Sequence, residues 1–344
     1  MKKTLLTLVK VLVSFGILVY IFTRVVHIRD LWAILRQADL TLFSLAVAVY
    51  FVVQGLSAYR WQVLLDPQGV HVPYRKMAAF YFLGMYFNFF LPSTIGGDVF
   101  RIYYLNKETR RLSASTASVF LDRDIGMGGL LLVATVVAAF DGTSFKGVPL
   151  APLFGLIGVG FVLANLALFY RPTYNLFHRL LALFKLKRAD EKVERMFGSV
   201  NCYRGRWGLM LETTLMSIGV QVGCVIVNVL SARAIGLNTS WVHFLVFIPA
   251  IGLISMNPIG VNGAGWREGA YIWLFQSVGA TPGQAAALSV LWLGAVVITS
   301  LPGGVIYIMR GARSEDRPPR SGDLDGDIEG NEEFAALQPE GEIV

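Results

Sequence analysis

Two stretches of this sequence combine helix-breaking residues with charged side chains inside apolar surroundings. Residues 88–105 read NFFLPSTIGGDVFRIYYL, and residues 255–280 read SMNPIGVNGAGWREGAYIWLFQSVGA. Each contains an asparagine, a proline, glycines, a carboxylate and an arginine. These are Asn88, Pro92, Gly96, Gly97, Asp98 and Arg101 in the first stretch, and Asn257, Pro258, Gly260, Gly263, Gly265, Arg267 and Glu268 in the second. Such a combination is suited to binding an anion such as a phosphate.

The chemistry follows from what the breaks expose. A proline ends a helix, and glycines let the chain turn. The next helix then begins inside the apolar region, with free N–H groups and a positive dipole end that favour anions. Asp98 and Glu268 fall in the first turn of these helices, and Arg101 and Arg267 can pair with them or with a phosphate. The alternative is structural: the carboxylates cap their helices and the arginines extend to the membrane surface.

A third charged cluster lies in LDRDIGMGG, residues 121–129, just before or within an apolar run. Asp122 and Asp124 diverge by about 200° around a helix, so both cannot face the same side. We expect one acid to pair with Arg123 and the other to face a cavity. The alternative places all three residues at the membrane interface.

Composition identifies the class of protein and excludes others. Of 344 residues, 55% are hydrophobic and only 15% are charged, whereas soluble domains carry about 25% charged residues. Two cysteines and four scattered histidines form no zinc or redox spacing, and no phosphate-binding Walker motif is present. We therefore predict an integral membrane protein with no cofactor, no metal and no nucleic-acid partner.

The elements that must position these residues are predicted to be helices. Apolar runs long enough to cross a bilayer, which needs about 20 residues, lie at about 4–22, 40–58, 115–139, 148–170, 208–235 and 284–309. Two shorter runs, 77–91 and 241–256, end at the Pro/Gly breaks. The predicted fold is all-α: a polytopic membrane helical bundle with about six full spans and two oppositely oriented re-entrant helical hairpins, resembling an inverted repeat.

Basic residues give the predicted orientation. Loop 171–206 holds nine basic and three acidic residues, and the segments 59–76, with Arg60, and 101–114 are also basic. We place these segments, and both termini, on the cytoplasmic side of a cell (inner or plasma) membrane. The first hairpin then enters from the cytoplasm and the second from outside.

Two domains are expected. Residues 1–310 form the integral membrane domain, whose N-terminal run is kept as a span rather than cleaved, and residues 171–206 form a cytoplasmic basic loop with an amphipathic helix. Residues 311–344 contain ten acids and three arginines, so the tail has a net charge of −7 and the remainder +14. We expect the tail to be disordered and the basic remainder to contact anionic lipid head groups.

The segments FNFFLPSTIGGDVFRIYYL and SASTASVFLDRDIGMGGLLLVATV, with NPIGVNGAGWREGAYIWLFQSVGATPGQAAALSVL further on, resemble the lysylphosphatidylglycerol synthase transmembrane-region family (UPF0104-type). Members are implicated in moving lipids or lipid-linked compounds between leaflets. Better-known relatives carry a soluble aminoacyl-transferase domain that this sequence does not contain, so synthase activity is not expected. The resemblance implies roles for Asn88, Pro92, Gly97, Asp98, Arg101, Arg123, Pro258, Gly260, Glu268 and Gly279. The insertion VNGAGW and the absence of an arginine from the last span depart from the family's pattern.

Three functions are compatible with these observations. The first is a flippase-like transporter, not an enzyme, whose arginines hold a lipid phosphate while the chains of the lipid stay in the bilayer. The second is a polyprenyl-phosphate-dependent glycosyltransferase, for which Asp30 and Asp39 are the candidate acids. The third is a non-transporting membrane partner of a cell-envelope lipid synthase, with the acidic tail as its contact. A homo-oligomer is compatible with each of them.

Overall fold

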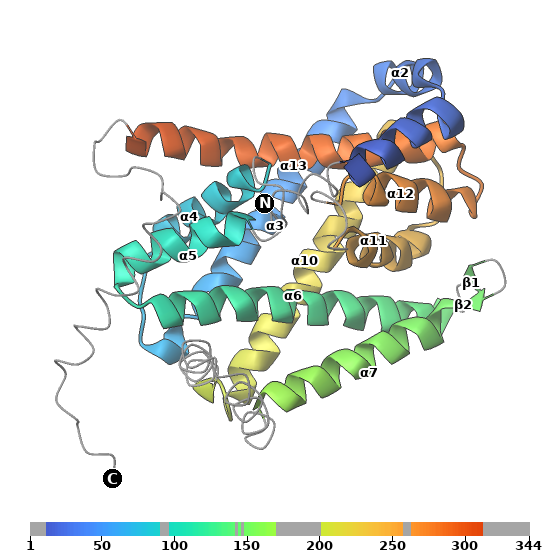
Figure 1. Cartoon of the computed structure of the whole chain (residues 1–344). Coiled ribbons are helices and arrows are strands. Elements are labelled where there is room, and N and C mark those ends of the chain that lie inside the picture. The colour runs from blue at the N-terminus through green and yellow to red at the C-terminus, as the bar shows by residue number, and fades with distance from the viewer. Residues whose placement is uncertain are drawn as a thin grey trace, which may run out of the picture.

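The structure is a computed structural model that describes residues 12–89, 96–141, 144–145, 148–169, 201–256 and 263–311. Nearly all of this part of the chain is helical, apart from two paired strands of two residues each, β1 (Ser144–Phe145) and β2 (Val148–Pro149). Figure 1 shows the helices packed as a bundle. The predicted all-α fold is therefore confirmed.

Four long helices form the frame of the bundle. They are α3 (Leu40–Val63), α6 (Leu112–Asp141), α10 (Trp207–Ala234) and α13 (Pro282–Gly311). Each contains a window with a mean hydropathy of 1.6 to 1.9. A helix of 24 to 30 residues is about 36–45 Å long, enough to cross the roughly 30 Å apolar core of a bilayer.

The other predicted spans are shorter or bent. Residues 12–25, which end in the π-helix η1 (Ile21–Val25), meet α2 (Ile28–Arg36) at an angle of 85°. In α7 (Leu150–Phe169) the apolar part is Ala151–Leu166. By length and composition, four of the described helices can cross a membrane, or five if the bent pair counts as one span. The total of six spans stays a prediction.

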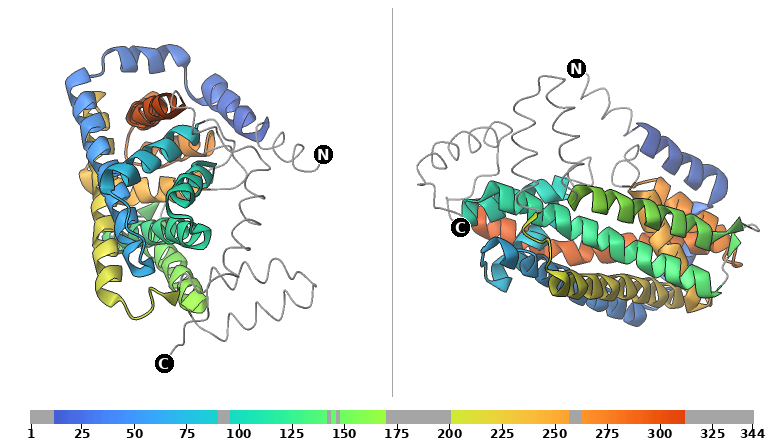
Figure 2. Two further views of the ribbon diagram at one scale, coloured as in Figure 1. Left: turned by 90° about the vertical axis from the view of Figure 1, so that its left-hand side faces the viewer. Right: turned by 90° about the horizontal axis from the view of Figure 1, so that it is seen from below.

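Helices α3 and α10 form an antiparallel pair along one side of the bundle (Figure 2). The Asp39 N–H donates to the carbonyl of Ala234 at one end, over 2.8 Å. At the other end Arg60 contacts Ser217. Glycine on α10 allows such close packing, since a Cβ built on Gly223 would lie 2.3 Å from the Val53 side chain of α3; small residues are common where membrane helices meet.

The breaks in the sequence produce two antiparallel hairpins. In the first, α4 (Tyr74–Phe87) folds back on α5 (Gly96–Thr109), and the rings of Phe87 and Phe100 stack with their centroids 3.8 Å apart. In the second, α11 (Trp241–Ser255) folds back on α12 (Trp266–Gln276). These helices have 11 to 15 residues and are about 16–23 Å long, too short to cross the bilayer core alone.

The hairpins pack against opposite ends of α13 (Figure 1). The first shares an apolar cluster with Ile306 and Tyr307, near the C-terminal end of α13. The second shares a cluster with the alanine-rich N-terminal turn, through Leu288. The guanidinium of Arg310, at the C-terminal end of α13, lies over the rings of Phe80 and Tyr104, which are far from the break in the first hairpin. The break therefore points away from this end of α13, toward its middle. The short connection from α12 into α13 points the second break the opposite way, so the hairpins have opposite directions along α13.

Tyr203, which precedes α10, is hydrogen-bonded to the C-terminal end of α3 and the segment that follows it. Its hydroxyl donates to the carbonyl of Leu64 and accepts from the Gln68 amide over 2.7 Å. Burial raises the pKa of the Tyr203 phenol well above its usual value. The predicted amphipathic helix 174–200 and the tail beyond residue 311 lie outside the described residues.

Candidate functional site

The most buried charges of the described chain form a pair between α3 and α6. The guanidinium of Arg60 lies 2.8 Å from a carboxylate oxygen of Asp122 and also donates to the Ser217 hydroxyl on α10 over 2.7 Å. Arg60 is 5% exposed and Asp122 is 2% exposed. Sequence analysis assigned Arg60 to a cytoplasmic basic loop, but it lies within α3 and joins three of the long helices.

Arg101 of α5 connects the first hairpin to this pair. Its Nη2 lies 2.7 Å from the second carboxylate oxygen of Asp122, and its Nη1 lies 3.4 Å from Asp98. The guanidinium also stacks over the rings of Trp61 and Tyr81, at 4.2 and 4.6 Å from their centroids. Cation–π contacts of this kind stabilise a desolvated arginine.

Arg123 completes the arrangement by pairing with the other carboxylate oxygen of Asp98. We call these five residues the ion chain: Arg60, Asp122, Arg101, Asp98 and Arg123, in which arginines and aspartates alternate. Three guanidiniums and two carboxylates leave one excess positive charge. The inner members are buried, whereas 39% of the Arg123 side chain is exposed, so the accessible end of the chain is cationic.

Close backbone contact sets the position of Asp98. A Cβ atom built on Gly97 would lie 2.1 Å from the carbonyl oxygen of Gly84, so only a hydrogen fits there. The Asn88 side chain accepts the Gly97 N–H over 2.7 Å and thereby satisfies a free donor at the start of α5. Asp98 follows in the first turn, where the helix dipole favours a carboxylate.

The third cluster is divided among three neighbours. Asp122 faces Arg60 and Arg101, Arg123 faces Asp98, and Asp124 accepts a hydrogen bond from the Asn165 amide of α7 over 3.2 Å. The expected pairing of Arg123 with an adjacent acid is therefore wrong: its carboxylate partner comes from α5. Helical geometry explains this, because consecutive residues point about 100° apart.

The second constellation is mainly local. A carboxylate oxygen of Glu268 accepts the Gly265 N–H over 2.7 Å, and Arg267 donates its Nε–H to the same carboxylate over 3.0 Å. Gly265 has φ +84°, a left-handed conformation, and Ser14 and Ile17 press against it. Glu268 thus has the geometry of a helix-capping carboxylate.

The two constellations attach to different parts of α10. The ion chain reaches Ser217, whereas the Tyr271 hydroxyl, one turn beyond Arg267, donates to the Asn228 side chain over 2.6 Å. Eleven residues of helix separate these attachment points by about 16 Å. Within the described ranges, no ion pair joins one constellation to the other.

The structure accounts for part of the predicted site. It brings together Asn88, Gly96, Gly97, Asp98, Arg101 and Arg123 around the first break, and Gly263, Gly265, Arg267 and Glu268 around the second. Pro92, Asn257, Pro258 and Gly260 lie outside the described residues. Sequence reasoning missed Arg60, although an Arg-Trp pair deep in an apolar run was a usable signal.

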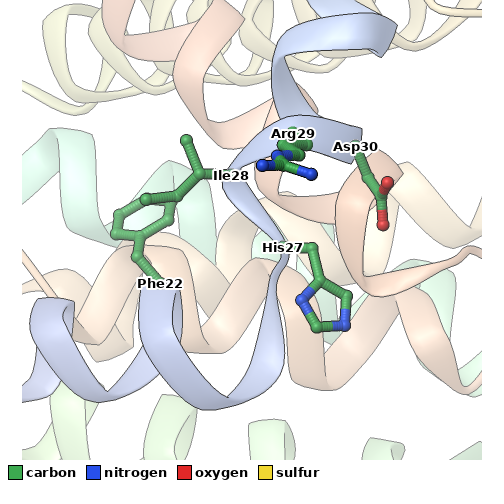
Figure 3. A pocket seen from close by; sticks show the side chains of 5 residues that line it. All are labelled: Phe22, His27, Ile28, Arg29 and Asp30. Atoms are coloured by element: carbon green, nitrogen blue, oxygen red, sulfur yellow. The ribbon is translucent and has the colours of Figure 1, made fainter.

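Shallow pockets also lie on the described surface away from the ion chain. One, of about 420 Å³, lies at the turn before α2 and is lined by Phe22, His27, Ile28, Arg29 and Asp30, whose side chains spread around the turn (Figure 3). Another, of about 300 Å³, is apolar and lies between α6 and α11. Among the described residues, no group of three or more His, Cys, Asp or Glu side chains could hold a metal ion.

Comparison with known proteins decides the family. Residues 7–303 match the lysylphosphatidylglycerol synthase transmembrane region. The chain belongs to this family. It is also 26% identical, over 279 residues, to a UPF0104 membrane protein of Methanothermobacter thermautotrophicus, an alignment that covers 75% of this chain and 81% of the relative. The family match includes the ion chain and both hairpins, and together with the long apolar helices it identifies a multi-pass membrane protein.

Proposed function

We propose that this member of the family is a flippase-like transporter, without catalytic activity of its own, that moves a phosphate-bearing lipid or lipid-linked compound between leaflets. The ion chain holds the phosphate, and the acyl or prenyl chains of the lipid remain in the bilayer. The protein works in the cell membrane with both termini in the cytoplasm. Its partners are anionic lipids, with a cell-envelope synthase or a second copy of the chain as a further partner.

The observation that carries this proposal is the partly exposed guanidinium of Arg123 at the accessible end of the ion chain. Charges inside a membrane cost several kcal/mol and mark ion or substrate pathways. The four buried members of the chain are two arginines and two aspartates, and Arg123 places a further guanidinium beside the break of the first hairpin. A guanidinium matches the geometry of a phosphate through two parallel hydrogen bonds.

The structure gives less support to a glycosyltransferase. One of its two candidate acids, Asp39, caps α3 by accepting the N–H groups of Thr41 and Leu42 over 2.7 and 3.2 Å. The other, Asp30, lies on the exposed surface of α2. A capping carboxylate whose oxygen already accepts two backbone hydrogen bonds is poorly placed to bind a metal and a sugar.

The test is a head-group translocation assay in proteoliposomes with fluorescent phosphatidylglycerol. The wild type should exchange the labelled lipid between leaflets faster than protein-free liposomes, and the variant with Asp98→Ala and Glu268→Ala should be slower than the wild type. Equal translocation by the wild type, this variant and protein-free liposomes would refute transport. Loss of function on deletion of residues 312–344, with translocation unchanged, would instead favour a role as a partner protein.

A further inference from the structure

The contact between Asp98 and Arg123 is the starting point of the inference. The accessible end of the ion chain is the guanidinium of Arg123, and an oxygen of Asp98 on α5 meets it there. A carboxylate and a phosphate present the same kind of oxygen to an arginine. Both cannot pair with the same face of one guanidinium, so binding of one displaces the other.

We infer that Asp98 is an internal competitor for the anion site, and that a phosphate group binds by taking its place on Arg123. This inference rests on the proposed function and concerns the regulation of the same site. Without ligand, the pair of Asp98 and Arg123 ties the first hairpin to α6. When a phosphate pairs with Arg123, the ion pair between Asp98 and Arg123 breaks, and Asp98 keeps its contact with Arg101.

The remaining contacts explain why the exchange frees only the broken end of the first hairpin, next to Asp98, while the rest of the hairpin stays attached to the bundle. Arg101 stays fixed by Asp122 at 2.7 Å and by its stacking on Trp61 and Tyr81. Asp122 in turn stays paired with Arg60. Within the ion chain, the outermost pair alone changes partner, and its arginine is the one member that is substantially exposed.

The exchange predicts opposite effects of two substitutions on the affinity for phosphate. Arg123→Gln removes the phosphate's partner, and loss of a charged hydrogen bond should weaken binding by about tenfold. Asp98→Asn removes the competitor together with one negative charge, so it should tighten binding by at least about threefold. If Asp98 were instead a direct contact or a structural brace, Asp98→Asn would weaken binding.

A control matches the change in net charge. Asp66→Asn changes the net charge by the same amount on the exposed helix η2 (Asp66–Gln68) and should leave binding unchanged. Calorimetric titrations of the full chain in zwitterionic nanodiscs use two probes, inorganic phosphate and dihexanoyl-phosphatidylglycerol, which separate a free anion from a lipid head group.

Tighter binding of either probe by Asp98→Asn, with Asp66→Asn unchanged, supports the exchange. Weaker or equal binding overturns it. A second measurement does not depend on whether Asp98→Asn folds. Spin labels are attached to cysteines that replace Phe89 and Leu132, in a chain whose native Cys202 and Cys224 are replaced by alanine. The distance between the labels should change when a probe binds to the otherwise wild-type chain, and an unchanged distance at saturation overturns the inference.

These results separate the inference from the proposed function. If Asp98→Asn binds phosphate more tightly but no form of the protein translocates lipid, the exchange stands and transport fails. If the wild type translocates lipid but Asp98→Asn binds more weakly, transport stands and the exchange fails.

Discussion

The close contact between Gly84 and Gly97 predicts how much a larger residue at position 97 would destabilise the protein. In Gly97→Ala the new Cβ would lie 2.1 Å from the carbonyl oxygen of Gly84 and 2.7 Å from the Asn88 side chain. Ordinary contacts begin at 3.4 Å, so the two helices of the first hairpin must separate by about 1 Å. Overpacking of this kind costs about 1–3 kcal/mol, and the shift also moves Asp98 relative to Arg123.

A matched control separates overpacking from helix propensity. At Gly155 of α7, no described heavy atom lies within 4 Å of the position that a Cβ would take, and alanine favours a helix by about 0.5–1 kcal/mol over glycine. Gly155→Ala should therefore be neutral or slightly stabilising. Thermal unfolding in detergent, followed by size-exclusion chromatography, compares the two. If Gly97→Ala melts at the same temperature as Gly155→Ala, the reasoning about the hairpin contact is refuted.

Three further substitutions test separate parts of the account. Arg60→Gln leaves Asp122 with a single arginine partner. Because breaking a buried ion pair costs about 3–5 kcal/mol, the melting temperature should fall sharply. A shift as small as that of a surface substitution would contradict the burial of this pair. Glu268→Gln should retain most translocation, because glutamine also serves in a capping box, whereas complete loss of activity would indicate that the carboxylate carries a proton or binds the ligand. Tyr203→Phe removes the donor to the Leu64 carbonyl and should cost about 0.5–1.5 kcal/mol in chemical unfolding; an unchanged midpoint would show that this hydrogen bond does not hold α10 to α3.

Local signals in the sequence predicted the elements well. Proline and glycine mark both breaks, and the helices that follow them begin close to Gly96 and Gly265, as the stop and start signals indicate. The two hairpins run in opposite directions along α13, whereas the membrane side from which each one enters, inferred from loop charges, stays a prediction. These features depend on residues near one another in the sequence, which is where pattern reasoning is strongest.

The ion chain was predicted only in part, because its pairs are long-range. Sixty-two residues separate Arg60 from Asp122 and 157 separate Arg60 from Ser217. Nothing in a single sequence fixes which acid faces which arginine, because that depends on how three helices are rotated about their axes. The same limit explains Arg123, whose neighbours in sequence are acids but whose partner is Asp98.

The similarity of the two breaks in composition also concealed a difference in geometry. Asp98 pairs with arginines that come from its own helix and from α6. Glu268 instead caps its own helix and pairs with the adjacent Arg267. Composition alone cannot separate a carboxylate that crosses between helices from one that closes a turn, because both occupy the first turn of a helix.

The most direct test of the central claim compares two substitutions that each remove one positive charge. Lys76 forms an exposed ion pair with Glu108, a kind of pair worth about 0–1 kcal/mol, so Lys76→Gln should translocate labelled phosphatidylglycerol in proteoliposomes at the wild-type rate. Arg123→Gln should be slower by about tenfold, as expected for loss of a charged hydrogen bond. Equal rates for the two variants would contradict a role for the ion chain in holding the lipid phosphate.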